Sequence, residues 1–130
     1  MRLACWSGKG VSAALIVVTL LVCAIVLSAR SPGPREIHLV AREMTFYLDG
    51  EGEPNPMLHL RSGEEIRIVF HNEDTGIRHD FTIPDWGVAT KRIEGKGETT
   101  ITFRAPAQST SPNYQCSPHS AMMRGSIAVE

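Results

Sequence analysis

The sequence predicts an all-β domain folded as a β-sandwich, preceded by one apolar N-terminal helix. Two observations predict the sandwich. Apolar and polar residues alternate in short runs throughout residues 36–130, and turn-forming residues separate those runs. No convincing helical period occurs in that region, and seven or so short strands with frequent turns are typical of a sandwich.

The first 29 residues predict a membrane anchor or a signal peptide. Residues 11–29 read VSAALIVVTLLVCAIVLSA and contain no charged side chain. Cleaved signals have apolar cores of about 7–15 residues, whereas a bilayer span needs ~20. The length therefore favours an uncleaved anchor, with a cleaved signal as the alternative. Residues 30–35, which include Ser31-Pro32-Gly33-Pro34, are interpreted as a linker to a single domain at residues 36–130.

Alternation predicts the strands of the domain in order. They are expected at residues 37–40, 44–48, 58–60, 66–70, 79–83, 100–103 and 126–130, with a further strand around Tyr114. Turn signals lie at residues 49–52, 62–63, 72–76 and 95–97. The short connections favour an antiparallel sandwich.

Charge and cysteine content argue against binding to polyanions and rule out a disulfide within the domain. From Glu36 onward there are nine Lys and Arg residues and 14 Asp and Glu residues, so the domain carries a formal charge of −5. A negative domain of this kind argues against binding to nucleic acid or to anionic lipid. Cys116 is the one cysteine after residue 35, so the domain contains no internal disulfide. A lone thiol in an exported domain needs another explanation, and metal ligation is one.

Strand parity separates the histidines. His38, His59 and His71 lie in the alternate register to their apolar neighbours and are expected to point outward. His79 shares its register with Phe81 and Ile83, so it is expected to point into the sandwich. An inward histidine is either hydrogen-bonded in the core or a ligand.

A second motif favours the ligand interpretation. Cys116-Ser117-Pro118-His119 opens a tight loop, and Met123 follows before the last strand. Two imidazoles and one thiolate, with a weak axial thioether, make a blue-copper electron-transfer site. The sequence therefore predicts one copper ion held by His79, Cys116, His119 and Met123. Met122 is the alternative axial ligand, but the register of the last strand places Met123 inward.

These motifs resemble the cupredoxin family of type 1 copper proteins. Cys116-Ser117-Pro118-His119 is similar to the ligand loop of plastocyanins and amicyanins, and Met123-Arg124-Gly125 is similar to the azurin loop. The resemblance implies a Greek-key sandwich, and it implies electron exit through a near-surface His119 surrounded by Pro118, Ala121 and Met122. One departure is Asp80, where these families usually carry an Asn that ties the two ligand segments together. A carboxylate at this position is expected to accept backbone N–H bonds and to favour Cu(II).

The function predicted from the sequence is electron transfer between extracytoplasmic redox proteins, such as a cytochrome or a membrane oxidoreductase complex, by a tethered carrier. No nucleic acid and no small-molecule substrate is expected. Copper trafficking or copper resistance is the alternative. Enzyme activity is not expected, because the domain lacks the second ligand cysteine of a dinuclear copper centre and the paired His-x-His motifs of multicopper oxidases.

Overall fold

The structure is a computed structural model that describes residues 33–130. The predicted anchor or signal segment (residues 1–29) and the first part of the predicted linker lie outside the described residues. In residues 33–130, no helix has the length and apolar character needed to cross a bilayer.

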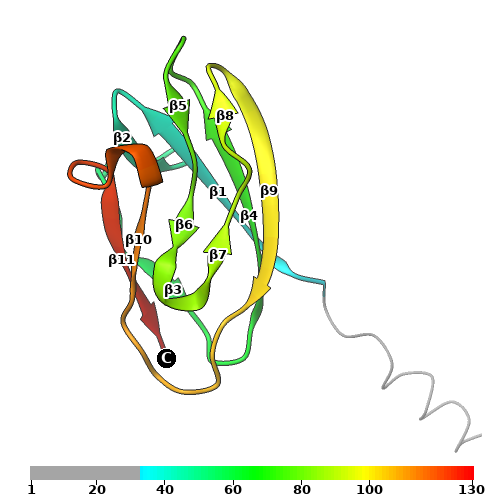
Figure 1. Cartoon of the computed structure of the whole chain (residues 1–130). Helices are drawn as coiled ribbons and strands as arrows, with labels where there is room; N and C mark the ends of the chain where they lie inside the picture. Colours follow the sequence, from blue (N-terminus) through cyan, green and yellow to red (C-terminus); the bar gives the residue numbers. More distant parts are fainter. Residues whose placement is uncertain (1–32) are drawn as a thin grey trace, which may run out of the picture. The chain divides into compact units, whose positions relative to one another are not determined.

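The described residues fold into strands joined by turns and two short 3₁₀ helices (Figure 1). In chain order the elements are β1 (Arg35–Arg42), β2 (Thr45–Leu48), β3 (Leu58–Leu60), β4 (Glu65–Asn72), β5 (Arg78–His79), β6 (Thr82–Ile83), η1 (Pro84–Trp86), β7 (Val88–Ala89), β8 (Ile93–Glu94), β9 (Gly97–Arg104), β10 (Asn113–Gln115), η2 (Ser117–His119) and β11 (Arg124–Val129). The all-β prediction is therefore confirmed for this part of the chain. Six predicted strands overlap β1, β2, β3, β4, β9 and β11, and the strand expected around Tyr114 is β10.

Two sheets enclose the core. One has the strand order β2-β1-β4-β9 and the other the order β3-β11-β10-β6-β7, while β5 and β8 form a separate pair at one end (Figure 1). The expectation of purely antiparallel pairing is wrong, because β1 runs parallel to β4 and β3 runs parallel to β11. Alternation identifies the buried face of a strand, but it carries no information about the direction of the neighbouring strand.

An aromatic cluster fills the core beside β10. Tyr114 packs edge-on against Phe46, with ring centroids 5.3 Å apart, and lies 5.5 Å from the ring of Phe81. Its hydroxyl donates a 2.7 Å hydrogen bond to the carbonyl oxygen of Pro56, so the buried polar atom is satisfied. Tyr114 is two residues before Cys116, and this packing therefore anchors the strand that carries the thiol.

The strand predicted at residues 79–83 is interrupted. His79 ends β5 and Thr82 begins β6, and these two strands belong to different sheets. Between them, the backbone N–H of Phe81 donates to the hydroxyl of Thr90 rather than to a neighbouring strand. His79, Phe81 and Ile83 are all buried, as their shared register predicts, but Asp80 and Thr82 between them are buried as well. The break separates His79 from the two larger sheets and leaves it in the β5–β8 pair at the end of the sandwich, opposite Ile93.

Gly125 provides a test of the packing around β10. It pairs with Tyr114 across the β10–β11 ladder, and a Cβ atom added at Gly125 would overlap the ring of Tyr114. We expect Gly125→Ala to lower the free energy of unfolding of the copper-free protein by about 1–3 kcal/mol, because overpacking displaces a buried ring. The measurement is chemical denaturation followed by circular dichroism.

Gly52→Ala is the matched control, because a Cβ atom there meets no other atom within 4 Å. Equal denaturation midpoints for the two variants would contradict the close contact between Gly125 and Tyr114.

Candidate metal centre

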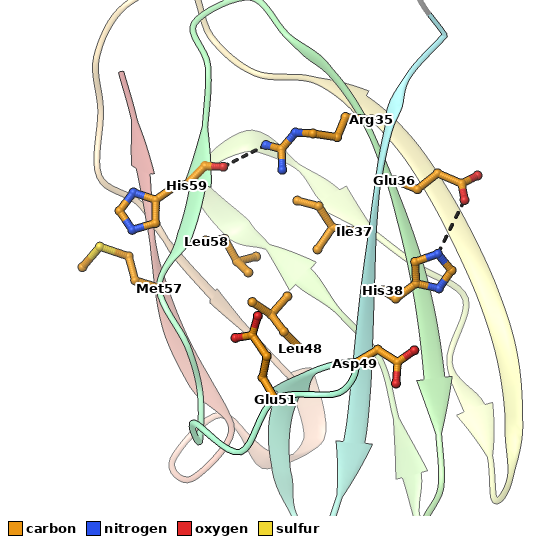
Figure 2. A pocket seen from close by; sticks show the side chains of 10 residues that line it. All are labelled: Arg35, Glu36, Ile37, His38, Leu48, Asp49, Glu51, Met57, Leu58 and His59. Carbon is orange, nitrogen blue, oxygen red and sulfur yellow. Dashed lines mark hydrogen bonds and ion pairs between the residues drawn. The ribbon is translucent and has the colours of Figure 1, made fainter.

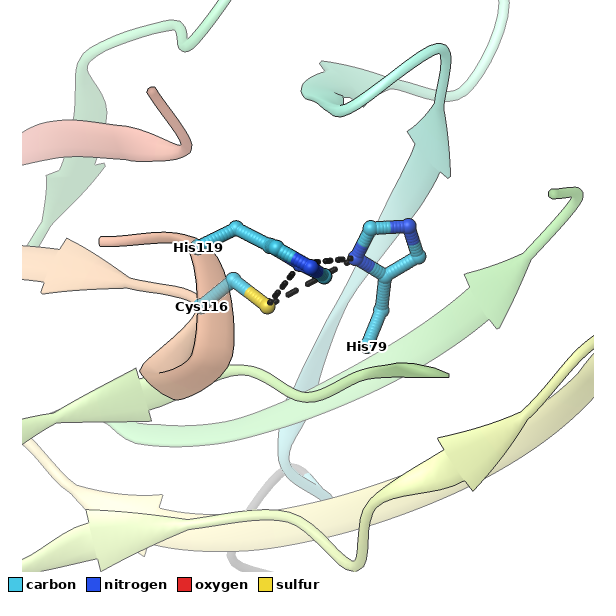
Figure 3. Close-up of side chains that lie close together, drawn as sticks. All are labelled: His79, Cys116 and His119. Atoms are coloured by element: carbon cyan, nitrogen blue, oxygen red, sulfur yellow. Dashed lines mark hydrogen bonds between the residues drawn. The ribbon is translucent and has the colours of Figure 1, made fainter. Parts of the chain in front are cut away.

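His79, Cys116 and His119 converge at one end of the sandwich (Figure 3). The Cys116 Sγ atom lies 3.5 Å from His79 Nδ1 and 3.6 Å from His119 Nδ1. The two Nδ1 atoms are 3.3 Å apart. His79 thus meets Cys116 and His119, which follow it by 37 and 40 residues in the chain, and the three donor atoms face a common point.

The size of this triangle fits a first-row transition-metal ion. With edges of 3.5, 3.6 and 3.3 Å, the point equidistant from the three atoms lies about 2.0 Å from each, close to ordinary metal–nitrogen and metal–thiolate lengths. One thiolate and two imidazoles provide the mixed soft and borderline donors that suit copper in both of its oxidation states. The donor set therefore fits a type 1 copper site, as the sequence predicts.

The loop after β10 positions Cys116 and His119 through its own backbone. Ser117–His119 forms η2 with Pro118 in its first turn, and the N–H of His119 donates to the carbonyl of Cys116 at 3.1 Å. The N–H of Met123 donates to the carbonyl of His119 at 2.9 Å, and the N–H of Cys116 donates to the carbonyl of Met123 at 3.0 Å. These bonds close residues 116–123 into a compact loop.

Burial distinguishes the two methionines of this loop. Met123 is fully buried, whereas Met122 is 57% exposed. The Met122 carbonyl accepts a 3.1 Å hydrogen bond from the side-chain amide of Asn55, which holds this part of the loop against the β2–β3 connection. The inward and outward orientations expected from the register of the last strand are thus observed.

Asp74 fixes the orientation and tautomer of His79. The Nε2 atom of the fully buried His79 lies 2.9 Å from Asp74 Oδ2. An ionised carboxylate only accepts hydrogen bonds, so Nε2 carries the proton and the lone pair of Nδ1 faces Cys116 and His119. Sequence reasoning missed Asp74, because its spacing from His79 matches no ligand motif.

Asp74 also stabilises the turn between β1 and β2. Its carboxylate accepts the backbone N–H groups of Glu43 (2.8 Å) and Met44 (3.2 Å), and both of these residues have positive φ angles. Burial acts to raise the pKa of Asp74, but these two bonds and the one from His79 together lower the pKa. The carboxylate is therefore ionised at neutral pH and links a distant turn to the buried imidazole.

The protonation states of Cys116 and His119 determine how many protons a metal ion must displace. Burial is the main cause of a raised pKa for the Cys116 thiol, and the nearby Asp80 carboxylate contributes to the increase. Burial, followed by the proximity of His79, lowers the pKa of His119. At neutral pH the metal-free centre thus has a neutral His119 and a protonated thiol, and metal binding must release the thiol proton.

Asp80 links the two ligand segments, as the sequence predicts for a carboxylate at this position. Its Oδ1 atom accepts the backbone N–H of Ser117 at 2.6 Å. Ser117 follows Cys116, and Asp80 follows His79, so one hydrogen bond joins the neighbours of two donors. The bond contributes to holding the donors together before a metal is bound.

The other histidines lie outside this centre. His38 and His59 are exposed, on opposite sides of a groove between β1, the β2–β3 connection and β3 (Figure 2). His71 is half-buried and stacks on His38, with ring centroids 6.0 Å apart. The outward orientation predicted for all three histidines is confirmed, since His38 and His59 are exposed and the side chain of His71 is 34% exposed.

Comparisons with known proteins agree with this geometry. Residues 58–130 match the family described as copper-binding proteins of the plastocyanin/azurin family. Among curated protein sequences, none matches the chain significantly.

Solved structures with the same fold include blue copper proteins. Auracyanin A from Chloroflexus aurantiacus is 19% identical (TM-score 0.61), and the match covers 75% of this chain and 100% of that one. Reduced auracyanin from Roseiflexus castenholzii is 20% identical (TM-score 0.60; 76% and 99% covered). Rusticyanin from Thiobacillus ferrooxidans is 21% identical (TM-score 0.52; 77% and 79% covered). At these identities the likeness shows the fold alone, which is cupredoxin-like.

The hydrogen bond between Asp74 and His79 leads to a testable expectation. We expect Asp74→Asn to weaken copper binding by about 10–100-fold, because the imidazole loses the charged partner that orients it. Competition with a chromophoric Cu(I) chelator measures the affinity, and circular dichroism checks that the variant folds.

The neighbouring exposed carboxylate provides the control. Glu73→Gln removes the same charge from a side chain that is 51% exposed and is expected to leave the affinity within about threefold, since solvent screens exposed charges. Equal losses in the two variants would refute a specific role for Asp74.

Proposed function

Because this chain belongs to the plastocyanin/azurin family of copper-binding proteins, we propose that its domain at residues 36–130 is a type 1 copper electron carrier. His79, Cys116, His119 and Met123 hold the ion. The convergence of three donors at 3.3–3.6 Å from one another is the observation that carries this proposal. The buried Met123 is joined to this group by the backbone hydrogen bond that its carbonyl accepts from Cys116. The bound ion would supply a one-electron couple between Cu(I) and Cu(II).

The protein contributes rigidity to this couple. Three backbone hydrogen bonds close the 116–123 loop, and carboxylates fix His79 and the N–H of Ser117. A donor set that is held in place by the protein moves little when the charge on the ion changes. Low reorganisation of this kind favours rapid electron transfer. A set of four donors also leaves no open position for a substrate, which supports a carrier rather than an enzyme.

Electrons pass through His119. His79, Cys116 and Met123 are fully buried, whereas His119 is only half-buried. Pro118, Ala121 and the 57% exposed Met122 lie in the same loop and are uncharged. This small surface suits a brief encounter with another redox protein, since weak redox complexes use small interfaces.

The partners we propose are redox proteins such as a cytochrome or a membrane oxidoreductase complex. The domain works outside the reducing cytosol, because an unpaired copper-binding thiol is protected there from competing cellular thiols. The uncharged run at residues 11–29 supports tethering of the domain to the membrane. Within residues 33–130, the one group of three or more potential metal ligands is His79, Cys116 and His119, which does not favour copper trafficking through a second site.

Visible and electron paramagnetic resonance spectroscopy of the full chain loaded with Cu(II) tests the proposal. We expect an intense thiolate-to-copper absorption and a small copper hyperfine splitting, both of which disappear in Cys116→Ser. A colourless wild-type protein, or colour that survives the substitution, would overturn the assignment.

The axial ligand has its own test. Met123→Leu is expected to keep the blue colour and to raise the reduction potential, because loss of a donor disfavours Cu(II). We expect a shift of about tenfold in the redox equilibrium, which corresponds to 59 mV. Met122→Leu serves as the control, since Met122 is exposed. It is expected to change the reduction potential by less than about a third of the change that Met123→Leu causes. The reverse ranking of the two variants would assign the axial role to Met122.

A further inference from the structure

The Asp80 carboxylate has a second partner besides the N–H of Ser117. The Nε and Nη2 atoms of Arg92 each lie 3.3 Å from Asp80 Oδ2. Arg92 is in the connection between β7 and β8, so a third segment of the chain reaches the back of the centre. Both oxygen atoms of Asp80 are therefore engaged, one by the ligand loop and one by a guanidinium.

The negative charge of Asp80 lies in a poorly solvated region beside the metal centre. The Asp80 side chain is 6% exposed, whereas that of Arg92 is 48% exposed. Asp80 is adjacent in the chain to His79, and its hydrogen bond to Ser117 places it beside Cys116, which is a thiolate when metal is bound. Two negative charges in a poorly solvated region repel each other and favour the more positive state of a bound ion.

We propose that Arg92 is a positioning residue that neutralises Asp80 and thereby sets the balance between Cu(I) and Cu(II). Asp80 keeps the geometric role of a hydrogen-bond acceptor that ties the two ligand segments together. The guanidinium offsets the negative charge that this acceptor brings, so the pair acts on the centre much as a neutral group does. This inference rests on the proposed electron-transfer function.

The reduction potential distinguishes this role from that of an ordinary surface charge. Arg92→Gln leaves Asp80 uncompensated and is expected to shift the redox equilibrium toward Cu(II) by at least threefold, or about 28 mV at 59 mV per tenfold. Lys91→Gln is the matched control, because it removes the same charge from the exposed neighbouring residue and is expected to cause less than half of that shift. Equal shifts in the two variants would overturn the inference.

Two further variants test charge balance directly. Asp80→Asn retains an acceptor for the N–H of Ser117 but removes the charge, and we expect it to shift the equilibrium toward Cu(I). The double variant Asp80→Asn/Arg92→Gln is expected to return to within about twofold of the wild-type equilibrium. A double variant that stays as far from wild type as the larger single variant would contradict the proposal.

A copper-free measurement keeps the inference separate from the proposed function. In the metal-free protein, Asp80→Asn and Arg92→Gln are expected to have non-additive effects on the denaturation midpoint, because each residue loses its partner when the other is replaced. Additive effects would overturn the pairing itself.

Failure of the wild-type protein to show a reversible copper couple would overturn the proposed function together with this inference. A normal couple with equal effects of Arg92→Gln and Lys91→Gln would overturn this inference alone.

Discussion

The closure of the loop at residues 116–123 is the constraint on which the centre depends. The carbonyl of His119 accepts the N–H of Met123, and the carbonyl of Met123 accepts the N–H of Cys116. These backbone bonds determine where the thiol and the second imidazole lie, and they need no metal ion to form. The loop is in turn fixed at its base by β10 and β11, where Tyr114 packs over Gly125. The packing of Tyr114 in the core thus fixes the position of Cys116, which is only two residues further along the chain.

His79 reaches the same point from a distant part of the chain, and charged groups hold it there. Asp74 orients its imidazole, while Asp80 joins its strand end to the ligand loop and is balanced by Arg92. A buried carboxylate is costly unless it is paired or hydrogen-bonded, and both carboxylates meet that condition. The result is a rigid donor set whose surrounding charge is adjusted by residues that do not bind the ion. Such a separation of binding and tuning suits a carrier whose redox balance must match that of its partners.

Local sequence pattern predicts much of this arrangement. The register that His79 shares with Phe81 predicts that it is buried, and the spacing of Cys116, His119 and Met123 identifies the loop, because these features depend on neighbours in the chain. The parallel pairing of β1 with β4 and the interruption after His79 depend on contacts between distant segments, which alternation does not encode. For the same reason Asp74 and Arg92 were not predicted. Arg92 lies twelve residues after Asp80, at no spacing that a motif would reveal. The anchor expected at residues 1–29 stays a prediction.

X-ray absorption spectroscopy of the copper-loaded protein in its oxidised and reduced forms tests whether the protein imposes a donor set of two histidines and one cysteine that is retained in both states. We expect two nitrogen donors and one sulfur donor at about 2.0–2.3 Å in each form, with little change on reduction. Loss of the sulfur donor, or a change in the ligand set between the two forms, would contradict this expectation.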